Sequence, residues 1–445
     1  GGGIMDFKEF NYQNIEDFKS DIRKMGLDIP LSDNLEYLSG QVKVGSFTLA
    51  NSLAINPMEG TDGKLDGSPD DLTIRRYKRF SGSGAALIWF EAVAVVPEGR
   101  TCPRQLWIHR DNLPAFQRLC NDIIENSRNA SGFTPLLIMQ LTHSGRFSKP
   151  QGKPAPVIAV HNPYLDPRLN IDENYPVISD SELEQLEDKF VEAAVLAKEA
   201  GFHGVDVKCC HRYLNSELLS AFTREGKYGG SFDGRSRFLL NTVKKIKERL
   251  GNDFIVTTRL NIYDGIPYPY GFGVDREDYL KPDFTEPVQL VKKLKELGMP
   301  LINLTMGTPY YNPHVNRPYD KGGYIPPEHP LEGIHRLITG IGEIQKQVPG
   351  IAVVATGYSW LREFAPFIAA GVLEKGLATV IGFGRQSFAY PEFAKDILSG
   401  KGLDRNKCCI ACGKCVEIMR AGGTTGCVVR DAKVYAPIYR EYCRG

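Results

Sequence analysis

Four cysteines near the C-terminus are spaced so that their thiolates can bind one metal centre. Cys409, Cys412, Cys415 and Cys427 follow the pattern C-x2-C-x2-C-x11-C in the run CCIACGKCVEIMRAGGTTGC. Cysteines three residues apart can point at one centre, and the Gly-rich stretch 421–426 lets the backbone bring the fourth one back. Zinc accepts the same four thiolates, but structural zinc sites are usually built from two CxxC pairs, so the compact triplet favours a 4Fe-4S cluster. A chain with such a cluster is expected to transfer electrons.

The chain upstream of these cysteines alternates short apolar runs with helix-like segments. Amphipathic stretches such as 181–200 and 235–250 lie between the runs, and Ser179 and Asp180 are suitable helix caps. Eight such units over about 350 residues predict an α/β fold, a (β/α)8 TIM barrel with its active site at the C-terminal ends of the strands. A doubly wound sheet is the alternative. The eight predicted strands are 53–57, 86–91, 135–141, 204–208, 254–260, 301–306, 351–356 and 379–383.

These elements divide the chain into three predicted parts. Residues 1–51 form a lead-in, and its last part, 41–51, predicts a hairpin with a turn at Gly45 that could close the floor of the barrel. Residues 52–400 form the barrel, and residues 401–445 form the short iron-sulfur segment. Two long loops are predicted to be functional lids because loops of such length rarely lack a role; they span residues 146–178 and 261–285.

The composition narrows the class of protein. The 445 residues carry a net charge of +1, with 42% hydrophobic and 24% charged residues, and no basic run that would indicate nucleic acid as a partner. The longest apolar stretch, 84–96, contains Glu91 and is too short to span a membrane, and no signal-peptide pattern opens the chain. Residues 1–3 resemble an expression scar. Five of the ten cysteines lie between Cys408 and Cys427, so we expect a cytoplasmic protein in a reducing, even anaerobic, cytosol that acts on a small molecule.

The predicted strand ends carry side chains that suit a flavin mononucleotide, FMN. Gly384 and Arg385 follow the last strand, where a small residue admits a phosphate and a guanidinium can bind it; Gly357 follows strand seven and can form the other wall. Gln140 ends strand three and can both donate to and accept from a pyrimidine ring. Arg259 ends strand five and can stabilise the negative charge of a reduced flavin.

Several motifs together resemble the Old Yellow Enzyme family of NADH:flavin oxidoreductases. They are Asn56-Pro57-Met58, GAALIWFEAVAVVPEGR at 84–100, QLTHSGRFS at 140–148, Tyr213-Leu214, KYGGSFDGRSRF at 227–238 and GFGR at 382–385. With its C-terminal cysteines the chain is similar to the iron-sulfur branch that contains 2,4-dienoyl-CoA reductase and trimethylamine dehydrogenase. The resemblance implies a barrel that binds FMN noncovalently, with the 4Fe-4S cluster beside it.

The resemblance also assigns FMN contacts residue by residue. Family members place a small hydrogen-bonding residue near the flavin just after the motif Asn-Pro-Met. In this chain either Glu59, which follows that motif, or Thr61 would take this role. The other FMN contacts that the resemblance implies are Pro57, Met58, Gln140, Arg259, Gly357, Gly384 and Arg385.

The reacting residues are expected just after strand four, in VDVKCCHRYLNSELL. The family has a histidine where this chain has Lys208, a histidine or asparagine at His211 and a tyrosine at Tyr213. By that resemblance the first two bind a substrate carbonyl over the flavin, and the tyrosine protonates the carbon beside the one that receives hydride. Lys208 departs from the pattern and would bind a developing enolate more strongly if it stays charged.

The loop MGTPYYNPHVNRP after strand six is a second place where substrate contacts are expected. Tyr310, Tyr311 and His314 would face the substrate if this loop folds over the site. In the dienoyl-CoA branch a histidine from this region joins the tyrosine, so the resemblance makes His314 a catalytic candidate.

These features predict an FMN- and 4Fe-4S-dependent ene-reductase. Its substrate would carry an activated C=C bond, as in an α,β-unsaturated ketone (a steroid-like enone included) or an enoyl thioester. No GxGxxG motif is present, and the chain ends 18 residues after Cys427, so we expect electrons from a separate ferredoxin, flavodoxin or reductase subunit. The alternatives are an amine or other dehydrogenase that passes electrons outward, and a non-catalytic barrel with zinc in the cysteine cage. Assembly into a homo-oligomer stays open.

Overall fold

The computed structural model describes residues 9–443; residues 1–3, predicted to be an expression scar, lie outside this part. Its main sheet has nine parallel strands, and strands that follow one another in the chain are hydrogen-bonded neighbours, except for β7 and β8. The last strand returns to the first, since Ile381 and Phe383 of β11 lie beside Leu53 and Ile55 of β3. The strands are β3 (Leu53–Ile55), β4 (Leu87–Ala94), β5 (Leu136–Thr142), β6 (Gly204–Val207), β7 (Ile255–Thr257), β8 (Arg259–Asn261), β9 (Leu301–Thr305), β10 (Ala352–Ala355) and β11 (Val380–Phe383).

The nine strands occupy eight barrel positions. β7 and β8 are separated only by Thr258, with β7 paired to β6 and β8 paired to β9. The Thr258 hydroxyl donates to the carbonyl of Val207 at 2.6 Å, which holds the break against β6. The predicted TIM barrel is therefore confirmed, its fifth strand is broken in two, and the doubly wound alternative is wrong.

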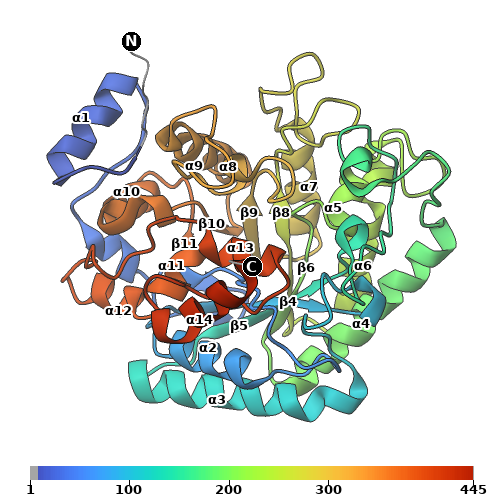
Figure 1. Cartoon of the computed structure of the whole chain (residues 1–445), viewed down its shortest axis with the longest axis horizontal. Helices are drawn as coiled ribbons and strands as arrows, with labels where there is room; N and C mark the ends of the chain where they lie inside the picture. Colours follow the sequence, from blue (N-terminus) through green and yellow to red (C-terminus); the bar gives the residue numbers. More distant parts are fainter. Residues whose placement is uncertain (1–8, 444–445) are drawn as a thin grey trace.

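Helices form a ring outside the strands (Figure 1). α4 shows why the sequence begins a helix where it does: Ser179 is the N-cap, Glu182 completes a capping box, and Gly201 ends the helix at φ 107°. The helices are α1 (Ile15–Met25), α2 (Asp71–Ser81), α3 (Leu113–Ser131), α4 (Asp180–Ala200), α5 (Leu214–Leu219), α6 (Phe232–Leu250), α7 (Thr285–Glu296), α8 (Pro313–Asn316), α9 (Pro330–Gln347), α10 (Ala365–Glu374), α11 (Arg385–Ala389), α12 (Phe393–Leu398), α13 (Lys414–Arg420) and α14 (Ala432–Cys443).

A hairpin covers the amino end of the barrel. β1 (Val42–Val44) and β2 (Phe47–Leu49) pair antiparallel around Gly45, whose φ of 60° suits glycine. Val44 and Leu49 are buried in one apolar cluster with residues from the first part of several barrel strands, including Leu87 and Leu136. The predicted hairpin is confirmed, and it packs against the floor of the barrel.

The cysteine segment is held against the loop after β3 and against α2. The Thr425 amide donates to the Gly60 carbonyl at 2.9 Å, and the Thr61 hydroxyl donates to the Gly423 carbonyl at 2.7 Å. Arg75 of α2 binds both carboxylate oxygens of Asp431 at 2.8 and 2.9 Å. Figure 1 shows this segment in red near α2, so the chain end lies on the barrel rather than apart from it.

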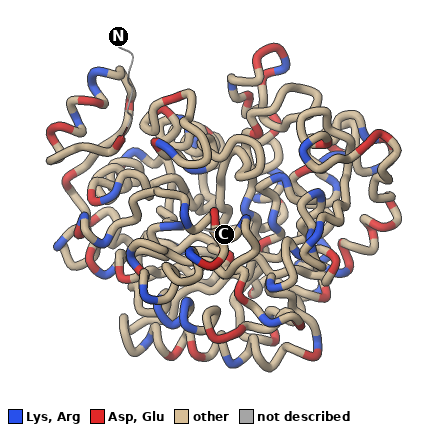
Figure 2. Tube along the Cα trace, in the orientation of Figure 1, with Lys and Arg blue, Asp and Glu red and all other residues tan. Residues whose placement is uncertain are grey.

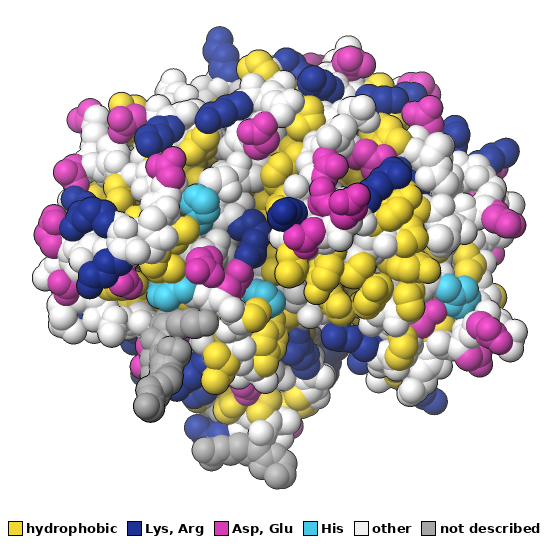
Figure 3. Space-filling view, turned by 90° about the horizontal axis from the view of Figure 1, so that it is seen from above, with side chains coloured by type: hydrophobic (Ala, Val, Ile, Leu, Met, Phe, Trp, Pro, Cys, Tyr) yellow, Lys and Arg dark blue, Asp and Glu magenta, His cyan; other side chains and the backbone are white. Residues whose placement is uncertain are grey.

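Charged side chains of both signs are spread over the molecule. Lys and Arg alternate with Asp and Glu along the trace in Figure 2, and the face in Figure 3 shows the same mixture between hydrophobic side chains. This distribution accords with the net charge of +1. Within residues 9–443, none of the helices has the length and apolar character needed to cross a membrane.

Candidate active site

The chain turns sharply where it leaves β6, and this turn presents the predicted catalytic residues. His211 and Arg212 have φ values of 62° and 60°, a region that non-glycine residues rarely adopt. Arg212 is fully buried, with one guanidinium nitrogen 2.8 Å from Asp264 and 2.6 Å from the Ser220 hydroxyl. This buried pairing holds the strained turn in place, as expected at a functional site.

Lys208 and Tyr213 face each other across this turn. The Lys208 ammonium lies 4.3 Å from the centre of the Tyr213 ring, in a cation-π arrangement. Lys208 is 5% exposed and forms no ion pair with any described carboxylate. Burial lowers the pKa of Lys208 and raises the pKa of Tyr213 well above its ordinary value. The phenol therefore stays protonated at neutral pH.

Tyr310, from the loop after β9, completes the pair of phenols. Its hydroxyl lies 2.7 Å from that of Tyr213, and its ring stacks on Phe147 at 3.7 Å between centres. Tyr310 as a residue is half-buried, and the contact links the buried Tyr213 hydroxyl to the loop after β9. The aromatic loop was the only signal in the sequence for this contact, and the structure places Tyr310 of that loop against Tyr213.

The two histidine candidates are placed differently. His211 lies beside Tyr213, with their rings edge to face at 6.1 Å, and burial followed by the charges of Lys208 and Arg259 lowers its pKa well below the ordinary value. Its imidazole is therefore neutral at neutral pH. His314 instead bonds the Tyr324 hydroxyl through Nδ1 at 2.5 Å. The structure does not bring His314 into the group around Tyr213.

Glu59 and Thr61 point to different partners. A Glu59 oxygen accepts from the Thr101 hydroxyl at 2.9 Å, and burial, opposed first by the charge of Lys208, raises the pKa of this carboxyl. The Thr61 hydroxyl is used by the carbonyls of Gly60 and Gly423. Of the two candidates, Glu59 is the one whose carboxyl interacts electrostatically with Lys208.

Asp206 of β6 positions two predicted FMN contacts. One of its oxygens accepts from Gln140 Nε2 and from Trp89 Nε1, both at 2.8 Å, and the other accepts from the Arg259 amide at 2.7 Å. Burial raises the pKa of Asp206 to about 6 despite these donors. Gln140 is thus oriented at the end of β5, and its Oε1 accepts no hydrogen bond from the described residues.

Arg259 is a buried cation without a carboxylate partner. Its side chain reaches only the Thr356 hydroxyl, at a long 3.4 Å, and its Nε has no partner among the described residues. Burial lowers its pKa. A guanidinium left unsatisfied at a strand end fits the anionic edge of a reduced flavin, which agrees with the role predicted for it.

The ends of β10 and β11 offer a second unpaired cationic group. A side-chain carbon added at Gly384 would lie 3.1 Å from the Met58 sulfur, and Gly357 has a φ of 103°. Arg385 and Arg317 act on each other without an ion pair to any described carboxylate, and burial with the charge of Arg385 lowers the pKa of Arg317 to about 10. Two such guanidiniums suit a phosphate. Arg317 carried no sequence signal, because only the fold brings it to Arg385.

Pro57 and Met58 continue β3 into this end of the barrel. Both are partly buried, and the preceding Asn56 is fixed by Asn303, whose amide donates to it at 2.9 Å. The predicted FMN contacts thus come together from β3, β5, β8, β10 and β11 at the carboxyl ends of the strands, where a TIM barrel carries its active site. The unbonded Gln140 oxygen and the unpaired Arg259 guanidinium fit the polar edge of FMN. The guanidiniums of Arg317 and Arg385 fit its phosphate.

Two of the four predicted cluster ligands, Cys409 and Cys412, interact electrostatically with each of the other two. Burial raises the pKa of Cys415 to about 11, and the charges of Cys409 and Cys412 contribute to the increase. Burial also raises the pKa of Cys427, with the same two cysteines among the contributing charges. Amide donors reach two of the sulfurs, from Ala411 to Cys409 and from Arg430 to Cys427, each at 3.3 Å.

This donor set has the chemistry of an iron-sulfur site. Four thiols with amide donors are what a 4Fe-4S cluster uses. The described residues contain no group of three or more His, Cys, Asp or Glu side chains arranged to hold a metal ion. A cube spreads its four thiolates further apart than one ion does, since a zinc ion holds each sulfur at about 2.3 Å. The 4Fe-4S cluster stays a prediction.

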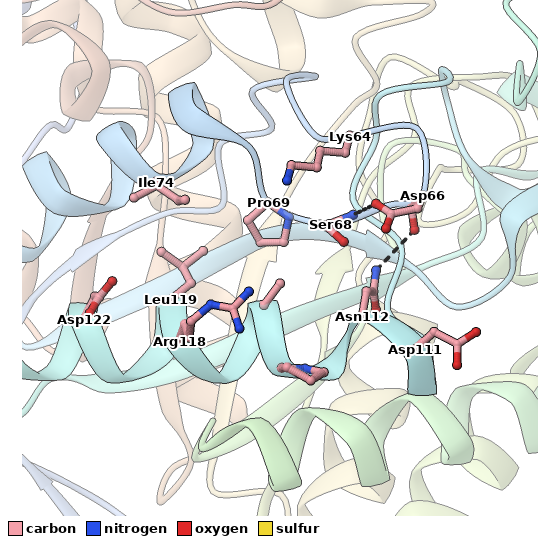
Figure 4. A pocket seen from close by; sticks show the side chains of 12 residues that line it. Lys64, Asp66, Ser68, Pro69, Ile74, Asp111, Asn112, Arg118, Leu119 and Asp122 are labelled. Atoms are coloured by element: carbon pink, nitrogen blue, oxygen red, sulfur yellow. Dashed lines mark hydrogen bonds between the residues drawn. The ribbon is translucent and has the colours of Figure 1, made fainter.

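The cysteines and the cationic group are adjacent. After burial, the charge of Arg385 acts most strongly on the pKa of Cys415, and the charge of Arg317 follows that of Cys409. The segment predicted to carry a cluster is therefore next to the end of the barrel predicted to hold the FMN phosphate. A separate cavity of about 330 Å³ lies between α2 and α3, and none of the candidate site residues lines it (Figure 4).

Comparisons with known proteins place the chain in a family. The family model described as NADH:flavin oxidoreductase / NADH oxidase matches residues 41–404. An NADH oxidase of Thermoanaerobacter brockii is 27% identical over 421 residues, covering 90% of this chain and 57% of the relative. A cinnamate reductase of Clostridium sporogenes is 26% identical over 416 residues, covering 90% of this chain and 58% of the relative.

A solved structure supports the same fold. A 2-naphthoyl-CoA reductase in complex with 2-naphthoyl-CoA superposes with a TM-score of 0.71 at 19% identity, covering 92% of this chain and 58% of that one. The chain thus spans a little over half the length of these relatives. The resemblance that its motifs indicated is confirmed: the chain belongs to the NADH:flavin oxidoreductase / NADH oxidase family, whose flavin is FMN.

Proposed function

We propose that this protein reduces an activated C=C bond, taking hydride from FMN and a proton from Tyr213. The observation that carries the proposal is the buried phenol pair beside an unpaired ammonium: Tyr213 with Tyr310 at 2.7 Å and with Lys208 at 4.3 Å. A cinnamate reductase is among the relatives, and we extend that reaction type to this chain. Bound FMN supplies the hydride from its N5.

Lys208 and His211 bind the group that activates the double bond. Lys208 supplies a positive charge where negative charge develops, and the neutral His211 supplies a hydrogen bond. Both come from the turn after β6, so they approach the substrate from one side. Arg259 and Gln140 orient the flavin, and Arg317 and Arg385 hold its phosphate.

Tyr213 is the general acid. A phenol kept protonated by burial can give its proton to the carbon beside the one that accepts hydride. The nearby ammonium of Lys208 then stabilises the phenolate. Tyr310 can return a proton to it through their shared hydrogen bond.

Cys409, Cys412, Cys415 and Cys427 would hold a 4Fe-4S cluster, which would supply electron transfer to FMN from an external donor such as a ferredoxin, a flavodoxin or a reductase subunit. The proximity of Cys415 to Arg317 and Arg385 supports this route. Residues 401–443 carry eight Lys and Arg against four Asp and Glu, a balance that favours an acidic donor.

The test of the acid is Tyr213→Phe. We expect the variant to bind FMN and to be reduced by dithionite as the wild type is, while reoxidation of its flavin by an enone slows by about 10²- to 10⁴-fold. Stopped-flow absorbance under argon measures both steps, with the exposed Tyr37→Phe as the matched control. Unchanged reoxidation would remove Tyr213 from this role.

The same preparation separates the alternative functions. Anaerobically purified protein should show flavin absorption, a broad iron-sulfur band, iron and acid-labile sulfide. Zinc without flavin would instead support a binding protein. Bleaching of the flavin by an amine alone would support a dehydrogenase, although the cationic surroundings of Lys208 and Arg259 disfavour a charged amine.

A further inference from the structure

Tyr310 lies on a short stretch of loop, residues 309–311, whose two ends are fixed. At one end Thr308 bonds to the turn after β6, and at the other Asn312 bonds to the loop after β8. The stretch itself belongs to no helix or strand. The amides of Tyr310 and Tyr311 bond to nearby Thr308, so backbone contacts with distant segments are left to the carbonyls.

Two arginines from distant segments donate to successive carbonyls of this stretch. The Arg420 guanidinium donates to the Pro309 carbonyl at 2.8 Å, and the Arg168 guanidinium donates to the Tyr310 carbonyl, also at 2.8 Å. Arg168 belongs to the long loop after β5, and its guanidinium also lies 4.7 Å from the centre of the Tyr311 ring. The stretch is thus held from two sides, and one of the two donors belongs to the cysteine segment.

Arg420 is carried by a helix that is itself well anchored. It is the last residue of α13, and Ile418 of that helix is fully buried against Val428 and Tyr435. The Arg420 side chain is exposed, so burial does not fix its position. Among the described residues, the Pro309 carbonyl is the one hydrogen-bond acceptor that its guanidinium reaches.

We propose that Arg420 is a positioning residue for proton delivery, because it holds the loop that places Tyr310 against Tyr213. The inference rests on the proposed function, in which Tyr213 is the acid. It gives the cysteine segment a second role besides the predicted cluster. The hydroxyls of the two tyrosines lie 2.7 Å apart, and a shift of the loop by about 1 Å would break their hydrogen bond.

The contact matters most when Tyr213 gives its proton to the substrate. The proton leaves the Tyr213 oxygen, the O–H electron pair stays there, and the new C–H bond uses the pair that hydride addition left on the carbon. The resulting phenolate can only accept hydrogen bonds, so Tyr310 is then the donor and stabilises this buried charge. Stacking on Phe147 orients the plane of the Tyr310 ring, and the backbone contacts fix how far its hydroxyl reaches.

The kinetic test compares Arg420→Met with Arg440→Met, which removes the same charge from an exposed position of α14. We expect dithionite to reduce the flavin equally in both holoenzymes. Reoxidation by 2-cyclohexen-1-one should be about 10-fold slower in Arg420→Met, as for loss of one charge-assisted hydrogen bond, and unchanged in Arg440→Met. Arg420→Lys should recover part of the rate, because an ammonium can still donate to the carbonyl. Equal reoxidation by wild type and Arg420→Met would overturn the inference and leave the ene-reductase standing.

A double variant shows whether Arg420 acts through Tyr310. Tyr310→Phe already lacks the hydroxyl, so adding Arg420→Met to it should slow reoxidation by less than about 2-fold further. If the two losses multiply instead, Arg420 acts on the flavin through its charge or on the fold in general, and the positioning role is wrong.

Hydrogen exchange tests the same contact without turnover. The amides of Tyr311 and Asn312 donate to the Thr308 carbonyl at 3.3 and 3.0 Å. In the oxidised holoenzyme, Arg420→Met should speed their exchange at least about 3-fold, and Arg440→Met should not. Mass spectrometry of peptides that cover 308–312 measures this.

This readout also separates the two levels of proposal. Unchanged exchange in Arg420→Met would overturn the positioning role whatever the enzyme reduces. If enones do not reoxidise the wild type, the ene-reductase is wrong, while faster exchange in Arg420→Met would still support the hold of Arg420 on the loop.

Discussion

Buried cations fall into two groups in this molecule. Outside the site, arginines are paired: Arg146, for example, binds Glu217 at 2.6 Å and the Val160 carbonyl at 2.8 Å. At the strand ends, the buried Lys208 and Arg259 and the half-buried Arg385 form no ion pair with a described carboxylate. The other paired arginines are Arg76 with Asp62 and Glu91, Arg212 with Asp264, Arg224 with Asp180 and Arg235 with Glu286.

The presence or absence of a carboxylate partner distinguishes structural arginines from the cations that can bind an anionic ligand. A buried charge costs several kcal/mol unless it is paired, and the fold supplies carboxylates to most of the buried arginines outside the site. Arg100 is the exception, because its guanidinium donates to three backbone carbonyls instead. Unpaired cations persist where an anionic partner arrives with a ligand. The flavin phosphate and the reduced flavin would be those partners.

The largest effect is expected from breaking a paired arginine. Arg146→Met leaves Glu217 and Asp166 without their cation, so we expect the free energy of unfolding to fall by about 3–5 kcal/mol. Denaturant titration of the holoenzyme measures it. The double variant with Glu217→Gln should recover part of the loss. If the free energy of unfolding of Arg146→Met equals that of the wild type, ion pairing does not determine the stability contributed by the buried arginines.

A pH effect is expected at His143, a buried base with no carboxylate. Burial lowers its pKa to about 4, and its Nδ1 accepts from the Gly145 amide at 2.9 Å. The unfolded chain takes up this proton near pH 6.5 and the folded chain only near 4. The stability that His143 contributes is therefore complete above pH 6.5 and is lost as the pH falls toward 4, by about 3 kcal/mol in all.

The measurement is the unfolding midpoint of the wild type and of His143→Gln between pH 4 and 7. The advantage of the wild type should grow as the pH rises across this window. Parallel curves for the two proteins would mean that the imidazole titrates normally.

The smallest effect is expected at an unpaired cation. Arg259→Met should weaken FMN binding by about 10- to 100-fold, as for loss of a charge-assisted hydrogen bond. It should not lower the stability of the FMN-free protein, because it removes a buried charge that the protein does not compensate. Fluorescence titration with FMN and denaturant unfolding check the two parts, with the exposed Arg249→Met as control. If Arg259→Met lowers the free energy of unfolding as much as Arg146→Met does, the paired and unpaired cations do not differ in their structural role.

Local patterns predicted much of the fold. The eight strand positions, the hairpin at Gly45 and the capped helix α4 follow from alternation, turn chemistry and caps, all of which act between near neighbours. The division of the fifth strand was not predicted, because the break at Thr258 depends on its bond to Val207 of another strand.

The sequence by itself determined the barrel and the family, and it indicated the cysteine spacing, the flavin contacts and the turn after β6. Tertiary structure decided which side chains meet. It brought Tyr310 rather than His314 to Tyr213, and it directed Glu59 to the site. Arg317 was joined to Arg385 in the same way. These contacts link loops far apart in the chain, and their energies depend on burial, which no local pattern records.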